Sequence, residues 1–154
     1  MLPGKITLMG IAMTTALFAA QTALADEAEY MAPPGDDGSA PYSQIVKYDD
    51  FIFLSGMLGT VPGTGALAEG GIGPETAQTL KNIKAALERA GGSMDDVLKC
   101  TVFLADIAEW GDMNAVYTTY FTNMPARSPE GESGLGLTAR VELECRAAMP
   151  EDDD

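Results

Sequence analysis

Apolar and polar residues alternate strictly near the end of the chain, over residues 140–147. The two sets fall on opposite faces, with Val141, Leu143, Cys145 and Ala147 on one and Glu142, Glu144 and Arg146 on the other. A period of two predicts a strand that is buried on one face only. The charged face, with Glu142, is then free to border a site.

Three earlier apolar runs predict further strands. Ile45-Val46 and Phe51 to Leu54 flank an acidic turn, which favours a hairpin, and Val97 to Leu104 is rich in β-branched residues. Ser55-Gly56 ends the second of these strands. A glycine there lets a ligand approach the backbone closely, although a plain turn is the simpler explanation.

Helical periodicity runs through two segments. The first, residues 74–90, starts at a proline, carries an apolar stripe and stops at Gly91-Gly92. The second, residues 107–121, follows Asp106 as an N-cap. Its periodicity predicts an inward-facing stripe of Ile107, Trp110, Met113, Tyr117, Tyr120 and Phe121. Asn114 lies on or near its buried stripe, where an amide is usually structural but can also orient a loop.

This order of strands and helices predicts an α+β domain with two helices on one face of a mixed sheet. The other face of such a sheet has no cover from its own chain. It must therefore lie in water or against another subunit, and the Val and Leu content of the strands favours an oligomer.

The first quarter of the chain has a different composition. Lys5 precedes an apolar run, and Ala23-Leu24-Ala25 offers a small-residue cleavage pattern, which predicts a secretory signal peptide. An uncleaved membrane anchor is the alternative, but the run is short for a span of about 20 residues. The expected organisation is a signal peptide over 1–25, a flexible acidic leader over 26–39, a folded domain over 40–150 and an acidic tail over 151–154. Cleavage implies a periplasmic or secreted protein without stable membrane insertion.

Composition excludes several kinds of site. The chain of 154 residues has a formal net charge of −14 and no histidine. That charge argues against a nucleic-acid partner, because such affinity comes largely from Lys and Arg. Without histidine a Cys/His zinc site is excluded, and we expect no metal. Cys100 and Cys145 are two cysteines whose pairing the sequence leaves open.

Arg127 and Glu142 are the candidate chemical pair. Arg127 follows Pro125-Ala126, and fifteen residues later the alternating strand presents Glu142. A guanidinium can bind a carboxylate through two parallel hydrogen bonds, so the pair suggests a site for a small acid. An ordinary interfacial salt bridge is the alternative.

Taken together, the motifs resemble those of the RidA (YjgF/YER/UK) family over about residues 40–148. The matching stretches are PYSQ (41–44), FLSG (53–56), the helix over 77–90, KCTVFLAD (99–106), MN with VY (113–117), YF (120–121), PARS (125–128) and RVELEC (140–145). The resemblance implies a chorismate-mutase-like fold, with a mixed six-stranded sheet, in a homotrimer with three clefts between subunits.

The resemblance also implies an activity: hydrolysis of reactive 2-enamine and 2-imine acids, such as 2-aminoacrylate, to 2-keto acids and ammonia without a cofactor. Carried over by position, Arg127 holds the substrate carboxylate and Glu142 positions or activates water. Tyr42 and Gly56 line the pocket next to Ser55, and Asn114 supports the arginine loop. The expected partners are a small carboxylate substrate and two further copies of the chain.

Residues 129–132 depart from the family pattern. Pro129 has no N–H where family members direct a backbone donor at the substrate, and it weakens a central strand. Glu130 and Glu132 add negative charge beside Arg127, and Met57 replaces a frequent glutamine. A non-catalytic trimeric binding or chaperone-like protein is therefore the second hypothesis. A ribonuclease role fits poorly with the charge and the missing histidine.

Overall fold

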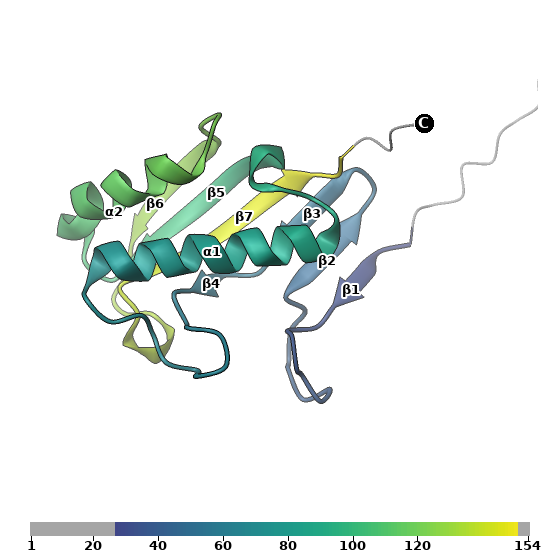
Figure 1. Cartoon of the computed structure of the whole chain (residues 1–154), viewed down its shortest axis with the longest axis horizontal. Helices are drawn as coiled ribbons and strands as arrows, with labels where there is room; N and C mark the ends of the chain where they lie inside the picture. The colour runs from purple at the N-terminus through teal and green to yellow at the C-terminus, as the bar shows by residue number, and fades with distance from the viewer. Residues whose placement is uncertain (1–26, 151–154) are drawn as a thin grey trace, which may run out of the picture.

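The computed structural model describes residues 27–150 (Figure 1). The regular elements are β1 (Glu29–Met31), β2 (Ile45–Tyr48), β3 (Phe51–Leu54), β4 (Met57–Leu58), α1 (Ile72–Ala90), β5 (Val97–Leu104), α2 (Trp110–Tyr117), β6 (Ala126–Gly131) and β7 (Val141–Ala148). Short 3₁₀ turns lie at Met94–Asp96, Ile107–Glu109, Thr118–Tyr120 and Gly136–Thr138. The expected signal peptide, residues 1–25, and the expected tail, residues 151–154, lie outside the described residues.

The strands form one mixed sheet in the order β1-β2-β3-β7-β5-β6, with β4 also paired to β7. Only β5 and β6 are parallel, and α2 connects them; the other pairs are antiparallel. The α+β class is confirmed. The described sheet has seven strands instead of the predicted six.

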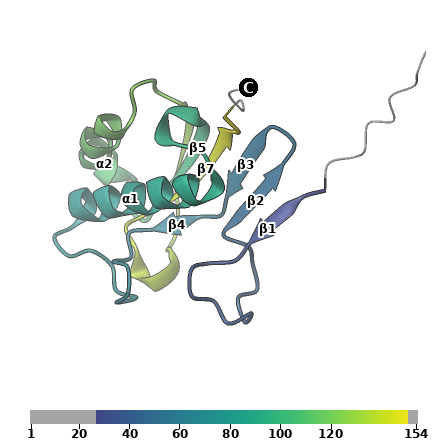
Figure 2. The same ribbon diagram turned by 45° about the vertical axis from the view of Figure 1, so that its right-hand side comes forward.

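One added strand comes from the segment predicted as a flexible leader. Residues 29–31 form β1, which lies beside β2 and pairs with it (Figure 2). Across this pair, Lys47 Nζ lies 2.6 Å from Glu29 Oε2. The acidic, Pro- and Gly-rich composition of residues 26–39 indicated no order. Pairing at the edge of a sheet uses backbone N–H and C=O groups, so it depends little on the side chains of the added segment. The amino-acid composition of the segment therefore could not predict this strand.

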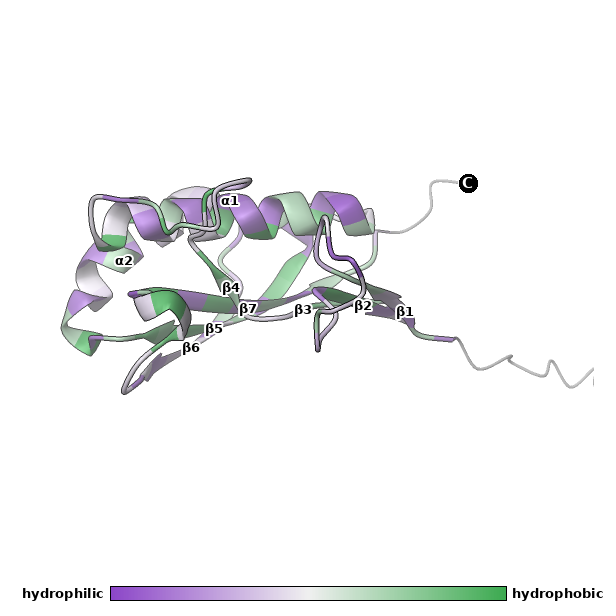
Figure 3. Cartoon of the chain, turned by 90° about the horizontal axis from the view of Figure 1, so that it is seen from below, coloured by the Kyte–Doolittle hydropathy of each residue, from purple (hydrophilic) through white to green (hydrophobic). Residues whose placement is uncertain are grey.

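Both helices cover the same face of the sheet (Figure 3). The buried stripe of α1 includes Leu80, Ile83 and Leu87, and the helix ends at Gly91, whose φ of 93° is left-handed as a helix-ending glycine requires. The second helix is shorter than predicted. Residues 107–109 and 118–120 are 3₁₀ turns, and Ile107, predicted to face inward, is 54% exposed.

The alternation in β7 is confirmed. Val141, Leu143, Cys145 and Ala147 are fully buried under the helices, whereas Glu142, Glu144 and Arg146 lie on the uncovered face. Phe51 and Phe53 of β3 add two partly exposed rings to that face, 6.3 Å apart. We call this uncovered side of the sheet the open face.

Cys100 of β5 and Cys145 of β7 stand directly opposite each other in the antiparallel register. Their Cα atoms are 4.1 Å apart, both residues are fully buried, and the two sulfurs form a disulfide. The pairing that the sequence left open therefore joins two adjacent interior strands of the sheet.

Candidate functional site

Arg127 lies on β6 between two aromatic rings of α2. Its guanidinium carbon is 4.5 Å from the centre of the Trp110 ring and 4.6 Å from that of Tyr117. Stacking on two rings stabilises the cation and restricts the guanidinium to one plane. A cavity of about 520 Å³ opens beside this stack, with walls from Trp110, Asn114, Tyr117, Thr118, Met124, Pro125, Arg127 and Pro129.

Three residues that line this cavity each have a buried polar atom that makes no hydrogen bond within residues 27–150: Arg127 Nη1, Asn114 Oδ1 and Tyr117 Oη. Buried polar groups in proteins almost always have partners, so a cluster of three indicates a place for a ligand or a second chain. Support of the arginine loop by the Asn114 side chain stays a prediction.

Glu142 lies on the open face, against Gly56. A Cβ built on Gly56 would overlap Glu142 Oε1, so only glycine leaves the carboxylate its present position. Burial, then the neighbouring charges of Glu144 and Glu132, raise the pKa of Glu142 above its ordinary value. A raised pKa makes a carboxylate a stronger base.

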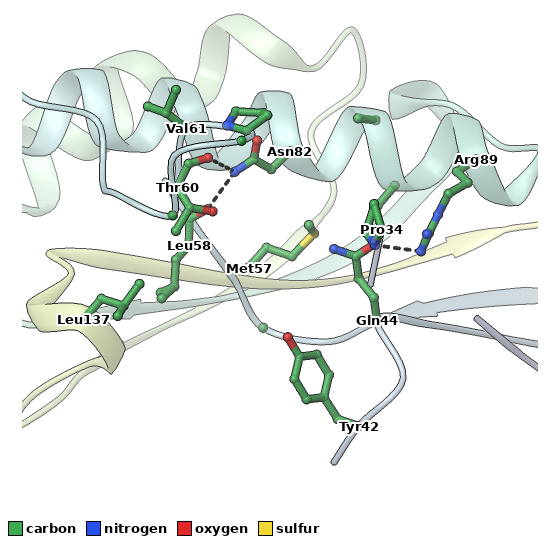
Figure 4. Close-up of a pocket in the computed structure, with 16 residues that line it drawn as sticks. Pro34, Tyr42, Gln44, Met57, Leu58, Thr60, Val61, Asn82, Arg89 and Leu137 are labelled. Carbon is green, nitrogen blue, oxygen red and sulfur yellow. Dashed lines mark hydrogen bonds between the residues drawn. The ribbon is translucent and has the colours of Figure 1, made fainter. Parts of the chain in front are cut away.

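Tyr42 and Gly56 line a second cavity, of about 650 Å³, between α1 and the β2–β4 segments (Figure 4). The amide of Asn82 holds the loop above it by donating to Leu58 O and Thr60 O, at 2.9 and 2.8 Å. Ser55 Oγ donates to Ser43 O at 2.7 Å. Ser55 is thus bonded to the segment that carries Tyr42, and its supporting role at a site stays a prediction.

Arg127 and Glu142 do not meet within one chain. Arg127 of β6 is in register with Cys100 of β5, and Glu142 of β7 is in register with Phe103 of β5. Cys100 and Phe103 are separated by an odd number of positions along β5. Side chains alternate between the two faces of a sheet, so Arg127 lies on the helix face and Glu142 on the open face. The chain carries two half-sites: the Arg127 cavity and the Glu142–Gly56–Tyr42 region.

Pro129 occupies an edge strand, and the prediction that it weakens a central strand is wrong. The Glu132 N–H donates to Leu104 O of β5 at 2.8 Å. Because backbone groups along a strand point alternately to its two sides, those of residues 128 and 130 also face β5. The backbone groups of residues 127 and 129 face the free edge of the sheet. The β5–β6 ladder loses no bond to the proline. What Pro129 lacks is an N–H at the free edge, beside the Arg127 cavity.

Glu130 and Glu132 were predicted beside Arg127, but they belong to the other half-site. Glu130 is in register with Phe103, which is in register with Glu142, so all three share the open face. Glu132 is close enough to raise the pKa of Glu142. Glu130 is three residues from Arg127 along the same strand. Because side chains alternate between the two faces, this odd offset places Glu130 on the opposite face from Arg127.

Trp110 and Tyr117 are the site residues that the sequence did not single out. Both were assigned to the core because their spacing of seven fits one face of a helix. The missed signal is that Asn114 falls between them on that same face. Among the described residues, no cluster of three potential metal ligands occurs, and no helix is long and apolar enough to span a membrane.

A mixed sheet with two helices on one face, and an arginine stacked on two aromatic rings beside a small cavity, defines an α+β domain. The family model described as Endoribonuclease L-PSP matches residues 35–149. The chain therefore belongs to this family, the RidA/YjgF family.

Named relatives agree with that assignment. Reactive Intermediate Deaminase A from Arabidopsis thaliana is 39% identical over 110 residues, which cover 71% of this chain but only 59% of the plant protein. The 2-iminobutanoate/2-iminopropanoate deaminase of Mus musculus is 42% identical over 110 residues, covering 71% of this chain and 82% of the mouse protein. The crystal structure of the YjgF gene product from E. coli superposes with a TM-score of 0.69 at 31% identity, covering 79% of this chain and 94% of that one.

Proposed function

We propose that the chain hydrolyses 2-imino and 2-enamino acids to 2-keto acids and ammonia, in clefts that form between copies of the chain. The observation that carries the proposal is the stacked Arg127 guanidinium, whose Nη1 is buried in a cavity without a partner in the described structure. A fixed, unpaired guanidinium is complementary to a small carboxylate. The names of the deaminase relatives supply the reaction class.

The chemistry needs few groups. An imine carbon is already electrophilic, so water can add to it once the substrate is held in place by its carboxylate. A 2-enamino acid first gains a proton at its β-carbon and loses one from its nitrogen, which gives the 2-imino acid. Glu142 then takes a proton from the attacking water and passes it to the nitrogen. The resulting carbinolamine breaks its C–N bond while the hydroxyl proton moves to the leaving nitrogen, which gives ammonia and the 2-keto acid. The raised pKa of Glu142 makes its carboxylate a stronger base for the proton transfer from water.

The cleft requires at least two chains, because Arg127 and Glu142 lie on opposite faces of one sheet. We propose the homotrimer of the family. The open face supports it, since Phe51 and Phe53 are 42% and 38% exposed there and no element of residues 27–150 covers them. We further propose that the mature protein acts after export, as the sequence of residues 1–25 predicts.

The test is ammonia release from 2-aminoacrylate generated in situ. We expect Arg127→Ala to lower the rate by about 10²-fold or more, because the anchor for the carboxylate is lost. Arg140→Ala is the matched control, since Arg140 is an exposed arginine that pairs with Glu109. Equal rates for the wild type and Arg127→Ala would exclude the proposed function.

A second candidate, a non-catalytic trimeric binding or chaperone-like protein, is favoured by Pro129. Its missing N–H at the free edge of β6 removes a donor next to the Arg127 cavity. This candidate predicts binding of small carboxylates without turnover. The variant Pro129→Ser restores the N–H, so a gain of turnover in Pro129→Ser over an inactive wild type would favour it.

A further inference from the structure

The Arg127 cavity holds a hydroxyl that the proposed reaction has not yet used. Tyr117 is 2% exposed, forms part of the cavity wall, and its Oη has no hydrogen-bond partner in residues 27–150. We propose that the Tyr117 hydroxyl is a further substrate contact, which donates a hydrogen bond to the carboxylate held by Arg127. This inference rests on the proposed function insofar as the ligand is a small carboxylate.

The ring of Tyr117 is fixed from two sides. Arg127 stacks on it at 4.6 Å, and the ring of Phe121 packs against it with centroids 4.7 Å apart. A side chain held in this way cannot turn its hydroxyl to another partner without disrupting the core. The hydroxyl is therefore positioned before any ligand arrives, in the same way as the guanidinium.

The hydroxyl also stays in its donor form. Burial raises the pKa of Tyr117 to about 12, and the nearby positive charge of Arg127 opposes this only in part. At neutral pH the group carries its proton and can donate it to an anion. A neutral donor beside a cation discriminates a carboxylate from a chloride ion, because it adds a directed bond at a second oxygen.

An unused buried hydroxyl has a measurable consequence. A buried donor without a partner lowers the stability of the free protein, whereas a donor with a partner contributes to it. Tyr117→Phe keeps the ring and its stacking on Arg127 but removes the hydroxyl. We therefore expect this variant to be more stable and to bind the ligand more weakly, a combination that a purely structural tyrosine would not produce.

The experiment measures binding and stability on the full chain, with 2-oxobutanoate as the probe because it has the carboxylate but does not react. We expect Tyr117→Phe to raise the Kd of 2-oxobutanoate about tenfold and to raise Tm by about 2–4 °C. In turnover, KM rises while kcat changes little, since the contact exists in both ground and transition states.

Tyr120→Phe is the matched control. The Tyr120 hydroxyl already donates to Ala77 O at 3.2 Å, so its loss should lower Tm and leave the Kd unchanged. Any one of four results would overturn the inference. Three concern Tyr117→Phe: a Kd within twofold of the wild-type value, a lowered Tm, or a smaller oligomer with unchanged affinity. The fourth is that the wild type does not bind 2-oxobutanoate. Binding that depends on Tyr117 without any turnover would sink the proposed hydrolysis and leave this contact intact.

Discussion

At the scale of single residues, Gly56 determines where the Glu142 carboxylate lies. A methyl group on residue 56 would overlap Glu142 Oε1, and the flexible glutamate can yield more easily than the strand. We expect Gly56→Ala to lower kcat/KM about 10²-fold, because a carboxylate displaced by about 1 Å no longer reaches its water. Stability should change by less than about 1 kcal/mol.

Steady-state kinetics and thermal unfolding check this prediction together. Gly134→Ala is the control, because a methyl group there meets nothing within 4 Å. A Gly56→Ala variant with wild-type turnover would mean that the Glu142 carboxylate need not keep its place against residue 56.

The acidic neighbours of Glu142 contribute to the pKa of its carboxyl group. Glu132 contributes to the raised pKa of Glu142, so Glu132→Gln should move that pKa back toward the ordinary value. If Glu142 acts as the base, activity rises with pH through its pKa, and the acid limb of kcat/KM should shift to lower pH in Glu132→Gln. The pH–rate profile measures the shift, and Glu88→Gln on the exposed face of α1 should leave it unchanged.

The same raised pKa fixes the sign of a stability effect. The folded state holds the Glu142 proton more tightly than the unfolded chain does, so protonation favours folding. This contribution is present below the unfolded pKa and is lost as pH rises through the raised folded pKa. We expect Glu142→Gln to remove that part of the pH dependence in urea-unfolding curves. If the free energy of unfolding of Glu142→Gln depends on pH in the same way as that of the wild type, the raised pKa of Glu142 is contradicted.

At the scale of elements, the disulfide joins β5 to β7 at the centre of the sheet. It closes a loop with a sequence separation of 45 residues, so its removal should destabilise the fold by about 2–4 kcal/mol. Denaturant unfolding of Cys100→Ala/Cys145→Ala, compared with wild type, measures this cost. Both cysteines are fully buried, so a reductant should act only as fast as the protein opens. Full reduction of folded wild-type protein within seconds would contradict that expectation.

What the sequence predicts about these elements depends on the range of the signal. Alternation in residues 141–147 and the stripe of α1 are local periodic patterns, and both are confirmed. The strand β1 and the order β7-β5-β6 depend on pairing between distant segments, which leaves no periodic trace in a single chain. For that reason the sequence suggested Arg127 and Glu142 as a candidate pair but did not show their separation onto two faces. The stacking of Trp110 on Arg127 was missed for the same reason.

At the scale of the whole molecule, the open face decides whether the chain can work alone. Phe53 lies near its middle, in register with Arg146. We expect Phe53→Glu to convert a trimer into monomers, because the interface would lose an apolar contact and bury a charge, a cost that pairing with the neighbouring Arg146 offsets only in part. Light scattering after gel filtration measures the mass, and Lys81→Gln on the exposed side of α1 controls for the same change of one unit in net charge. A wild type that is already monomeric would end the trimer proposal.

A mixing experiment tests the two half-sites directly. Arg127→Ala keeps the Glu142 half-site and Glu142→Gln keeps the Arg127 half-site, so each variant alone should be inactive. If every cleft takes Arg127 from one chain and Glu142 from its neighbour, unfolding and refolding the two variants together at equal amounts gives about a quarter of clefts with both residues. Activity should return to about that fraction of the wild-type rate. If one chain supplied both residues to its own cleft, no mixture of these variants would regain activity, because neither chain carries the complete pair.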